Sequence, residues 1–349
     1  MLGTKCFVID VPEFLACRYL IVIDDLWDAS VWDIISRALP KGSHGSRIIT
    51  TTQIEDVALT CCCYQSEYVF EMKHLDDDHS RKLFFNRLFC SERDCPEQFK
   101  DVLNEIVETC DGFPLATISI ASLLASQPVM SIDLLTYIQQ SLSSSLSTSE
   151  KTRQALNLSF NNLPHYLKTC LLYLIMYPEG STISKDELVT QWITEDFIGE
   201  GQDREKIAWH YFDELVSRGM IQPLDRNYND EVLTCTVHHM VLDLIRYKSL
   251  EENFIINVSC FQTTPGLPDK VRRLSVQFGG AKCANIPADF MMTQVRSLIF
   301  FGFLNCVPSF VEYKLLRVLV LHIWADESKI FDLTRIDELF QLRYLKIDC

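Results

Sequence analysis

The sequence predicts a multidomain fold that is α/β in its N-terminal part, mainly α-helical in the middle and built of repeated strands near its C-terminal end. Three observations lead to this prediction. Short apolar segments alternate with an amphipathic one up to residue 75, helical periodicity dominates up to residue 250, and a leucine pattern then recurs. With 349 residues and 48% hydrophobic side chains, the chain can bury ordinary hydrophobic cores.

Residues 1–75 predict an α/β domain. Leu20–Ile23 is a continuous apolar strand, and Arg47–Thr52 and Tyr68–Met72 are rich in β-branched or aromatic residues. Val31–Leu39 has the periodicity of a short amphipathic helix. Because continuous apolar strands are typical of sheets buried on both faces, we expect a parallel sheet here.

Residues 76–150 predict a helical domain. Four segments carry the helical pattern: Ser80–Phe89, Glu97–Cys110, Pro114–Ala125 and Ile132–Leu142. Asp78 or Ser80 is the expected cap of the first helix, and Gly112 followed by Pro114 marks a helix end and the next start. The serine-rich segment Ser141–Ser149 is expected to be a flexible link.

Residues 151–250 predict a second helical domain with a short strand at Leu233–Val237. A winged-helix module accounts for this order of elements. Such modules often read DNA, but a net charge of −15 and a pI near 5.0 create a field that repels polyanions. We therefore expect no nucleic-acid partner.

Residues 251–349 contain a repeated template. Its four copies are Val271-Arg-Arg-Leu-Ser-Val, Val295-Arg-Ser-Leu-Ile-Phe, Leu316-Arg-Val-Leu-Val-Leu and Leu342-Arg-Tyr-Leu-Lys-Ile. Their spacing falls in the range of leucine-rich repeats, roughly 20 to 29 residues, in which each unit adds one strand to a solenoid. The alternative is accidental leucine spacing in an ordinary α/β fold.

The spacing of the cysteines and the length of the apolar segments indicate the cellular compartment of the protein. The 14 cysteines are scattered, and Cys61–Cys63 lacks the paired spacing of a zinc site. Cys235 with His238 and His239 lacks the second ligand pair that such a site needs. No apolar segment has the length of a signal peptide or of a transmembrane helix. A reduced, cytoplasmic protein fits this pattern.

Adjacent aspartates, Asp24 and Asp25, directly follow the apolar strand Leu20–Ile23. Ligands bind parallel sheets outside the carboxyl ends of the strands, and neighbouring carboxylates there repel each other unless a cation lies nearby. In nucleoside triphosphatases a strand-terminal aspartate holds Mg²⁺ and a following acid can orient water. The alternative is a solvated strand end at which one aspartate caps a turn.

Four further segments follow in a recognisable order: Gly45-Ser-Arg-Ile-Ile-Thr-Thr-Thr-Gln53, Cys110-Asp-Gly-Phe-Pro-Leu-Ala116, Cys170-Leu-Leu-Tyr-Leu-Ile-Met-Tyr-Pro-Glu-Gly180 and Val237-His-His-Met-Val-Leu-Asp-Leu244. With the aspartates and the repeats, they closely resemble the NB-ARC module of plant nucleotide-binding, leucine-rich-repeat immune receptors, most of all the coiled-coil class of grasses. The resemblance extends from about Asp10 to the C-terminus. It implies an incomplete P-loop-type parallel α/β sheet, a helical ARC1 domain, a winged-helix (ARC2) domain and the start of a leucine-rich-repeat solenoid.

The resemblance also implies roles for the residues near the strands. Asp24 matches the acid that holds Mg²⁺ in the kinase-2 motif, and Asp25 matches the acid beside it, a candidate catalytic group that orients water. Thr51, Thr52 and Gln53 match a Thr-Thr-Arg element whose arginine senses the terminal phosphate.

Two more elements are matched further along the chain. Gly112, Pro114 and Leu115 match the Gly-Leu-Pro-Leu element, whose proline packs on adenine. His238 matches the histidine of the Met-His-Asp element, which touches the phosphates of ADP and locks the resting state. The cofactors that the resemblance implies are ADP or ATP with Mg²⁺.

The chain departs from the family pattern at the phosphate loop. No Gly-x-x-x-x-Gly-Lys-[Ser/Thr] segment occurs, and Gly3-Thr4-Lys5 is too short to replace it. Each charge-assisted hydrogen bond of such a loop contributes roughly 1.5 to 3 kcal/mol, so its absence predicts weak nucleotide binding or none. Lys5–Val11 could fill the place of the missing strand, or Asp10–Cys17 could be the end of the helix before the kinase-2 strand.

Smaller departures affect two other motifs. Gln53 replaces the sensor arginine, and a glutamine carries no charge. In the Met-His-Asp element, Val237 stands in place of the methionine and His239 in place of the aspartate, so we expect an altered resting lock.

We interpret the sequence as an N-terminally truncated immune receptor, an ADP/ATP switch by descent that is impaired in nucleotide binding and not catalytically active. The resemblance implies protein partners through the repeats, either a pathogen effector or a host protein, and assembly into a receptor oligomer. It also implies a cytoplasmic location or a peripheral one at the plasma membrane. Two alternatives stay open: a competent ATP-hydrolysing switch, and a pure protein-binding module of repeats.

Overall fold

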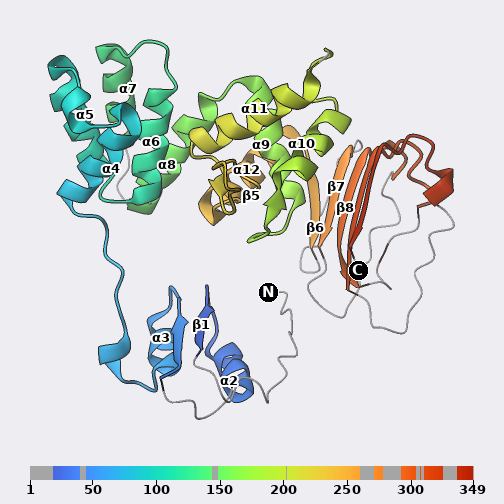
Figure 1. The fold of residues 1–349 in the computed structure, drawn as a ribbon, viewed down its shortest axis with the longest axis horizontal. Helices are drawn as coiled ribbons and strands as arrows, with labels where there is room; N and C mark the ends of the chain where they lie inside the picture. Colours follow the sequence, from blue (N-terminus) through green and yellow to red (C-terminus); the bar gives the residue numbers. More distant parts are fainter. Residues whose placement is uncertain are drawn as a thin grey trace. The chain divides into compact units, whose positions relative to one another are not determined.

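The computed structural model describes residues 19–39, 45–143, 148–201, 203–259, 271–277, 292–303, 307, 310–324 and 336–348. Lys5–Val11, a candidate strand, and Asp10–Cys17, a candidate helix end, lie outside these residues. Two compact units are present, one within Leu2–Lys73 and one within His74–Cys349. The expected mixed α/β fold is confirmed, with parallel strands in each unit (Figure 1).

The described residues of the first unit form two parallel strands and two α-helices. They are β1 (Leu20–Ile23), α2 (Ala29–Ala38), β2 (Arg47–Thr50) and α3 (Glu55–Cys61). Leu20 pairs with Arg47 and Ile23 with Thr50, so the carboxyl ends of β1 and β2 lie side by side. α2 begins at Ala29 because the Asp28 carboxylate accepts a hydrogen bond from the backbone N–H of Ser30.

Two expectations about this unit are wrong. Tyr68–Met72 is not a strand: Tyr68 ends a short 3-10 helix, η1 (Ser66–Tyr68), and Phe70 is 83% exposed. β1 is not buried on both faces either, since Leu20 and Val22 are 65% and 59% exposed. A strand needs a neighbour for its backbone hydrogen bonds, and the two strands and two short helices among the described residues of this unit offer too little surface to cover both faces.

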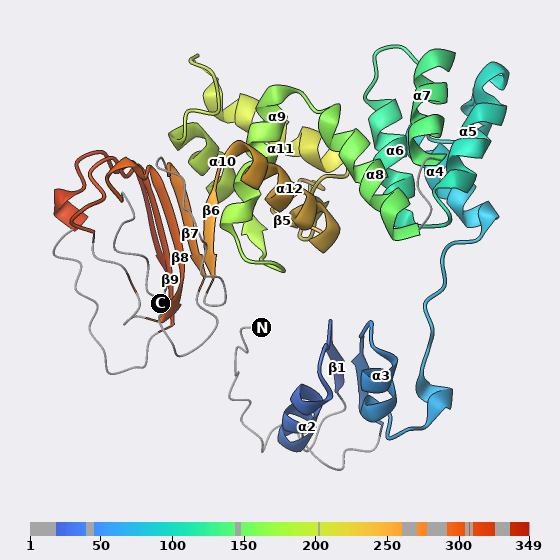
Figure 2. The same ribbon diagram turned by 180° about the vertical axis from the view of Figure 1, so that it is seen from behind.

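Five helices follow in the second unit. They are α4 (Asp77–Phe89), α5 (Glu97–Thr109), α6 (Pro114–Ala125), α7 (Ile132–Ser143) and α8 (Thr148–Asn161), with the 3-10 helix η2 (Glu92–Asp94) between α4 and α5. The predicted apolar stripes form their shared core, in which Phe84, Leu103 and Ile120 are completely buried. The four helices expected over residues 76–150 are therefore present (Figure 2).

The ends of these helices differ from the expectations. α4 is capped by Asp76, whose carboxylate accepts from the N–H of His79 at 2.8 Å, and neither Asp78 nor Ser80 takes this role. The serine-rich segment is also not a link throughout, because α7 extends to Ser143 and α8 already begins at Thr148. Three consecutive aspartates and a run of serines leave such boundaries open until tertiary packing selects one.

The middle of the second unit is a helical domain with a small antiparallel sheet. Its elements are α9 (His165–Tyr173), the 3-10 helix η3 (Leu174–Met176), β3 (Ile183–Ser184), α10 (Lys185–Thr194), α11 (Arg204–Ser217), β4 (Gln222–Pro223), β5 (Thr234–Thr236) and α12 (His239–Glu252). The strand expected at Leu233–Val237 is β5, which lies between β3 and β4. Trp192 and Phe212 are fully buried in the core beneath these elements. This arrangement is that of a winged helix.

The residues that the structure describes after α12 form a parallel sheet of five strands. They are β6 (Ile256–Ser259), β7 (Arg273–Gln277), β8 (Ser297–Phe303), β9 (Val318–Trp324) and β10 (Tyr344–Asp348), with the 3-10 helices η4 (Met292–Gln294) and η6 (Ile336–Glu338). The leucines of the four sequence copies pair in one row: Leu274, Leu298, Leu319 and Leu345. Figure 1 shows β6, β7 and β8 side by side. β6 was not expected.

The two faces of this sheet have different neighbours. The face with the leucine row packs into its own core, in which Leu274, Leu298 and Leu319 are completely buried. On the other face, Ile299 and Val320 belong to the core of the winged-helix domain. The sheet face that would be free in an isolated repeat module is therefore covered here.

Candidate functional site

The carboxyl ends of β1 and β2 form the first group of candidate residues. The Thr51 hydroxyl donates a hydrogen bond to Asp24 Oδ1, and it accepts one from the backbone N–H of Asp25 at 2.8 Å. The backbone of Thr51 also bonds to both sides of the aspartates, to the carbonyl of Ile23 at 3.0 Å and to the N–H of Leu26 at 2.8 Å. Thr51, which follows β2, thus connects to the residues that follow β1 and fixes both aspartates at the edge of the sheet.

This edge is open to solvent and negatively charged. Asp24 and Asp25 are exposed, and Asp25 has a left-handed backbone with φ 57°. Mg²⁺ is commonly held by one or two carboxylates together with water and phosphate oxygens. Asp24 offers such a carboxylate, so the residues fit this ion. Among the described residues, no cluster of three or more His, Cys, Asp or Glu side chains forms an all-protein metal site.

Thr52 and Gln53 lie just beyond this edge. The Thr52 hydroxyl accepts a hydrogen bond from the N–H of Ile54 at 3.1 Å, directly before α3 begins. Gln53 is exposed and uncharged. Thr52 therefore shapes the turn into α3, and Gln53 can offer an amide to a ligand but no positive charge.

A tight turn between α5 and α6 carries the second group. Asp111 and Gly112 both have positive φ, 55° and 70°. A Cβ at Gly112 would lie 2.3 Å from the carbonyl oxygen of Leu75, and the Gly112 carbonyl accepts from the N–H of Leu75 at 2.9 Å. Only glycine fits where two backbones approach so closely.

This turn presents Pro114 at the start of α6. Pro114 is exposed and occupies the first helical turn, where its fixed φ is favourable and no N–H is needed. Phe113 beside it packs on His74 with ring centres 4.3 Å apart, and Leu115 packs against the winged-helix core. The proline ring is thus rigidly placed and available for an apolar contact with a planar ligand.

His238 is the N-cap of α12. Its Nδ1 accepts a hydrogen bond from the backbone N–H of Met240 at 3.2 Å, so the ring is neutral with its proton on Nε2. Burial and then the neighbouring His239 lower the pKa of His238, and Glu179 opposes this shift. The ring stacks loosely on His239, with centres 4.3 Å apart. The site thus combines a helix N-terminus with an imidazole.

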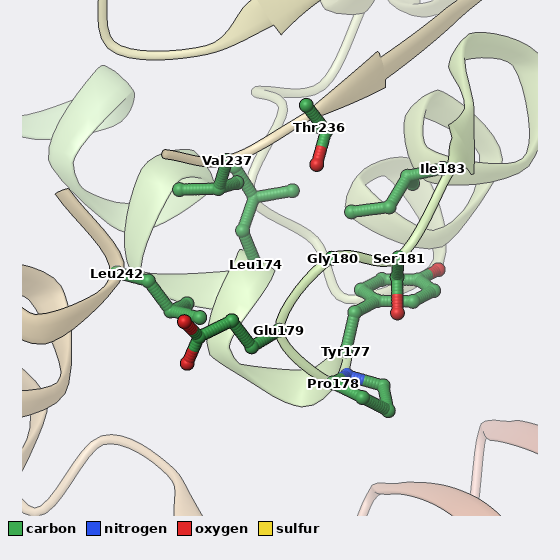
Figure 3. Close-up of a pocket in the computed structure, with 10 residues that line it drawn as sticks. All are labelled: Leu174, Tyr177, Pro178, Glu179, Gly180, Ser181, Ile183, Thr236, Val237 and Leu242. Carbon is green, nitrogen blue, oxygen red and sulfur yellow. The ribbon is translucent and has the colours of Figure 1, made fainter. Parts of the chain in front are cut away.

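A small pocket borders Val237, which precedes this histidine. It has room for about one water molecule and is lined by Leu174, Tyr177, Pro178, Glu179, Gly180, Ser181, Ile183, Thr236, Val237 and Leu242 (Figure 3). It is therefore too small for a nucleotide. Glu179 pairs with Arg246 at 3.3 Å. Sequence reasoning missed Glu179 as a neighbour of His238, although the Pro178–Gly180 turn was visible.

The predicted residues lie in separate groups. Asp24, Asp25 and Thr51 contact one another within Leu2–Lys73. Gly112, Pro114 and Leu115 form one turn, and His238 begins α12; both lie within His74–Cys349. Leu115 and Val237, the residue before His238, share the winged-helix core.

Comparison with known protein families gives two matches. Residues 11–94 match the NB-ARC domain, and residues 176–245 match the disease resistance protein winged helix domain. The aspartates and Thr51 fall in the first match, and Pro178 to His238 fall in the second. Nucleotide binding is a general property of the NB-ARC family.

Curated relatives match almost the whole chain. Disease resistance protein RGA5 of Oryza sativa subsp. japonica is 47% identical over 337 residues, which cover 94% of this chain and 30% of that protein. Disease resistance protein Pik-2 of the same organism is 37% identical over 339 residues, covering 94% of this chain and 33% of that protein. Putative late blight resistance protein homolog R1B-16 of Solanum demissum is 28% identical over 339 residues, covering 94% of this chain and 26% of that protein. The chain spans between about a quarter and a third of the length of these relatives.

No helix among the described residues combines the length and the apolar character needed to cross a bilayer.

Proposed function

This chain belongs to the plant disease-resistance proteins with an NB-ARC domain, and from that premise we propose that it is a segment of an immune receptor in which a nucleotide-binding edge is linked to a winged helix and a repeat sheet. The observation that supports the nucleotide part is the Thr51 bridge between Asp24 and Asp25 at the carboxyl ends of parallel strands. Small carboxylate and hydroxyl groups held in this way can position Mg²⁺.

The proposal assigns each residue a role toward the nucleotide, first in Leu2–Lys73 and then in His74–Cys349. Asp24 holds Mg²⁺ and Asp25 orients a water molecule, while Thr51 fixes the side chain of Asp24 and the backbone of Asp25. Pro114 packs on the adenine of ADP or ATP, with Gly112 and Leu115 holding its turn in place. His238, with Thr52 and Gln53, offers hydrogen bonds to phosphate oxygens. When bound, Mg²⁺ neutralises phosphate charge beside the two carboxylates.

Affinity for nucleotide in these 349 residues is expected to be low. The sequence contains no Gly-x-x-x-x-Gly-Lys-[Ser/Thr] segment, and Gln53 adds no charge. Losing about three or four charge-assisted hydrogen bonds, at roughly 1.5 to 3 kcal/mol each, moves binding from micromolar toward millimolar or weaker. We therefore propose a weak ADP site, without efficient ATP hydrolysis, for a polypeptide of these residues.

Backbone NMR of the 349-residue chain, titrated with ADP to 10 mM at constant excess Mg²⁺, tests this site. We expect shifts of the Asp24, Asp25 and Thr51 amides that do not saturate below about 1 mM. The Asp24→Asn variant should lose these shifts, and Asp33→Asn, an exposed carboxylate on α2, should keep them. Shifts that are absent, or that persist in Asp24→Asn, contradict the proposal.

The proposed partners are proteins: a pathogen effector or a host protein that contacts the repeats, and further receptor copies in an oligomer. The sequence similarity to disease resistance proteins supports such partners. A pure repeat module is not favoured, because one face of the sheet packs on the winged helix. For location we propose the cytoplasm or the inner side of the plasma membrane. The eight cysteines in the described part of the chain are free thiols, which suits a reducing compartment.

A further inference from the structure

An arginine recurs at the same position in each copy of the repeat template. The four are Arg272, Arg296, Arg317 and Arg343, and each directly precedes one of the strands from β7 to β10. The backbone N–H of Arg296 donates to the carbonyl of Arg272 at 2.7 Å. Those of Arg317 and Arg343 donate in the same way to the preceding arginine, at 2.7 and 2.9 Å. Because neighbouring strands lie about 4.8 Å apart, these residues form one continuous row, the arginine row.

The arginine row is accessible to solvent. Arg272 and Arg343 are exposed, and Arg296 and Arg317 are half-buried. Further along the same strands, side chains such as Ile299 are buried in the winged-helix core. A ligand can therefore reach the row while the winged helix covers the sheet.

Two winged-helix acids, Glu195 and Asp196, lie near the row, and the arginines around them already use their oxygens. Asp196 pairs with Arg317 and also lies 3.5 Å from Arg204 and 3.9 Å from Arg343. One carboxylate thus faces three arginines, and it neutralises only one of the three charges.

Glu195 is engaged through both of its oxygens. Its Oε2 lies 2.7 Å from Nε and 2.6 Å from Nη2 of Arg273, and Ser297 donates to its Oε1. Among the residues that the structure describes, neither Arg272 nor Arg296 forms an ion pair. The row therefore holds more positive charge than the acids beside it neutralise.

The pKa of Arg296 shows that these cations act on one another. Burial and then the charges of Arg317 and Arg272 lower this pKa, and Glu195 only opposes the shift. Like charges held this close repel each other, and an anion between them removes the repulsion. The surplus is local, since the chain as a whole has a net charge of −15.

Phosphate groups match this arrangement better than carboxylates do. A guanidinium donates two parallel N–H···O bonds to one phosphate. A phosphate monoester carries about −1.5 to −2 charges and three acceptor oxygens, so one group can bridge arginines on neighbouring strands. A long polyanion such as nucleic acid is repelled by the rest of this acidic chain. A small molecule with several phosphates fits both conditions.

We propose that the arginine row is a binding site for a compact, soluble polyphosphate of the inositol phosphate class. Arg272 and Arg296 bind it most directly, because their charges are free, and Arg317 and Arg343 extend the site beside Asp196. The row shares no residue with the proposed nucleotide site, so binding here is independent of ADP and of Asp24.

Isothermal titration calorimetry of the 349-residue chain with inositol hexakisphosphate, in buffer without Mg²⁺, tests the row. We expect saturable binding to one site, weakened about tenfold or more between about 50 and 200 mM salt. Arg272→Gln and Arg296→Gln should each weaken binding about tenfold or more. Arg226→Gln, which removes an exposed arginine paired with Asp230 between β4 and β5, is the matched control and should stay within about twofold of the parent chain.

Circular dichroism of each variant checks its folding, and the exposed Arg272→Gln keeps the test valid if the half-buried Arg296→Gln does not fold. Absence of binding, or equal weakening in Arg226→Gln, overturns the proposal. Displacement of the ligand by a glutamate peptide at the same charge concentration would assign the row to an acidic protein segment instead. Binding only to vesicles that contain phosphatylinositol bisphosphate, and not to the soluble phosphate, would assign it to a membrane surface.

Discussion

At the scale of single residues, two glycines with the same backbone conformation show how surroundings decide a substitution. Gly112 and Gly180 have φ of 70° and 73°. A Cβ at Gly112 would meet the Leu75 carbonyl at 2.3 Å, but a Cβ at Gly180 would meet nothing within 4 Å. Glycine is therefore required at position 112 for two reasons: the positive φ, and the close approach of the Leu75 backbone.

We expect Gly112→Ala to destabilise the second unit by about 3 kcal/mol or more, since the clash adds to the strain of an alanine at positive φ. Gly180→Ala, the control, carries only that strain and should cost about 1 to 2 kcal/mol. Urea unfolding of both variants, followed by far-UV circular dichroism, measures the difference. Equal costs would show that the Leu75 carbonyl moves aside freely.

At the same scale, part of the candidate site follows from the sequence and part depends on strand pairing. Asp24 and Asp25 were predicted from their position after an apolar strand, because ligand groups gather at the carboxyl ends of parallel strands. The bridging role of the Thr51 hydroxyl was not predicted, since it depends on the register of β1 against β2. The roles of these residues toward a nucleotide stay predictions until the titration above is done.

At the scale of elements, the start of α12 depends on the charge state of one histidine. Neutral His238 accepts a hydrogen bond from the N–H of Met240 through Nδ1. Protonation would turn Nδ1 into a donor and place a positive charge at a helix N-terminus, which the helix dipole disfavours. In the folded chain the pKa of His238 lies below its ordinary value of 6.5, first because of burial.

A lowered folded-state pKa means that the unfolded chain takes up the proton first as the pH falls. The contribution of His238 is therefore complete above about pH 6.5 and is lost as the pH drops through the lower, folded-state pKa. We expect His238→Asn, which retains a capping oxygen, to remove this loss of stability as the pH falls below about 6.5.

Thermal unfolding of both chains at several pH values measures this contribution. His165→Asn, an exposed histidine in the first turn of α9, is the control and should retain the parent pH response. An unchanged pH response in His238→Asn would show that His238 does not titrate in this range.

At the scale of the whole molecule, the two units differ in how much apolar surface they bury. In the first unit Leu20, Val22 and Ile49 are 65%, 59% and 50% exposed, although all belong to strands. In the second unit Leu298 and Phe300 of β8 are completely buried. A two-stranded sheet with so little burial is marginal by itself.

We therefore expect the backbone amides of β1 and β2 to exchange at least about 100-fold faster than those of β8 at neutral pH. Hydrogen exchange of the 349-residue chain, analysed by peptide, gives this comparison directly. The α12 peptides serve as a second reference in the same unit as β8. Equal protection in β1 and β8 would mean that the exposed strand residues are covered in solution.

Much of this organisation was determined by the sequence alone. Apolar periodicity located the four helices over residues 76–150, because a helix buries one stripe whatever its partner. The repeated leucines predicted strands in register, and Leu274, Leu298 and Leu319 form that row. Glycine and proline located the turn at Gly112 and Pro114, since their backbone preferences are local.

Only the tertiary structure decided which surfaces meet. The apolar strand Leu20–Ile23 predicted burial, but Leu20 is 65% exposed. Burial requires neighbouring elements, and a local sequence pattern does not specify these. Asp76 rather than Asp78 caps α4, because packing sets the first turn among three equivalent acids. The ion pair of Glu195 and Arg273 joins residues 78 positions apart, and only the docking of the sheet on the winged helix removes their charges from water.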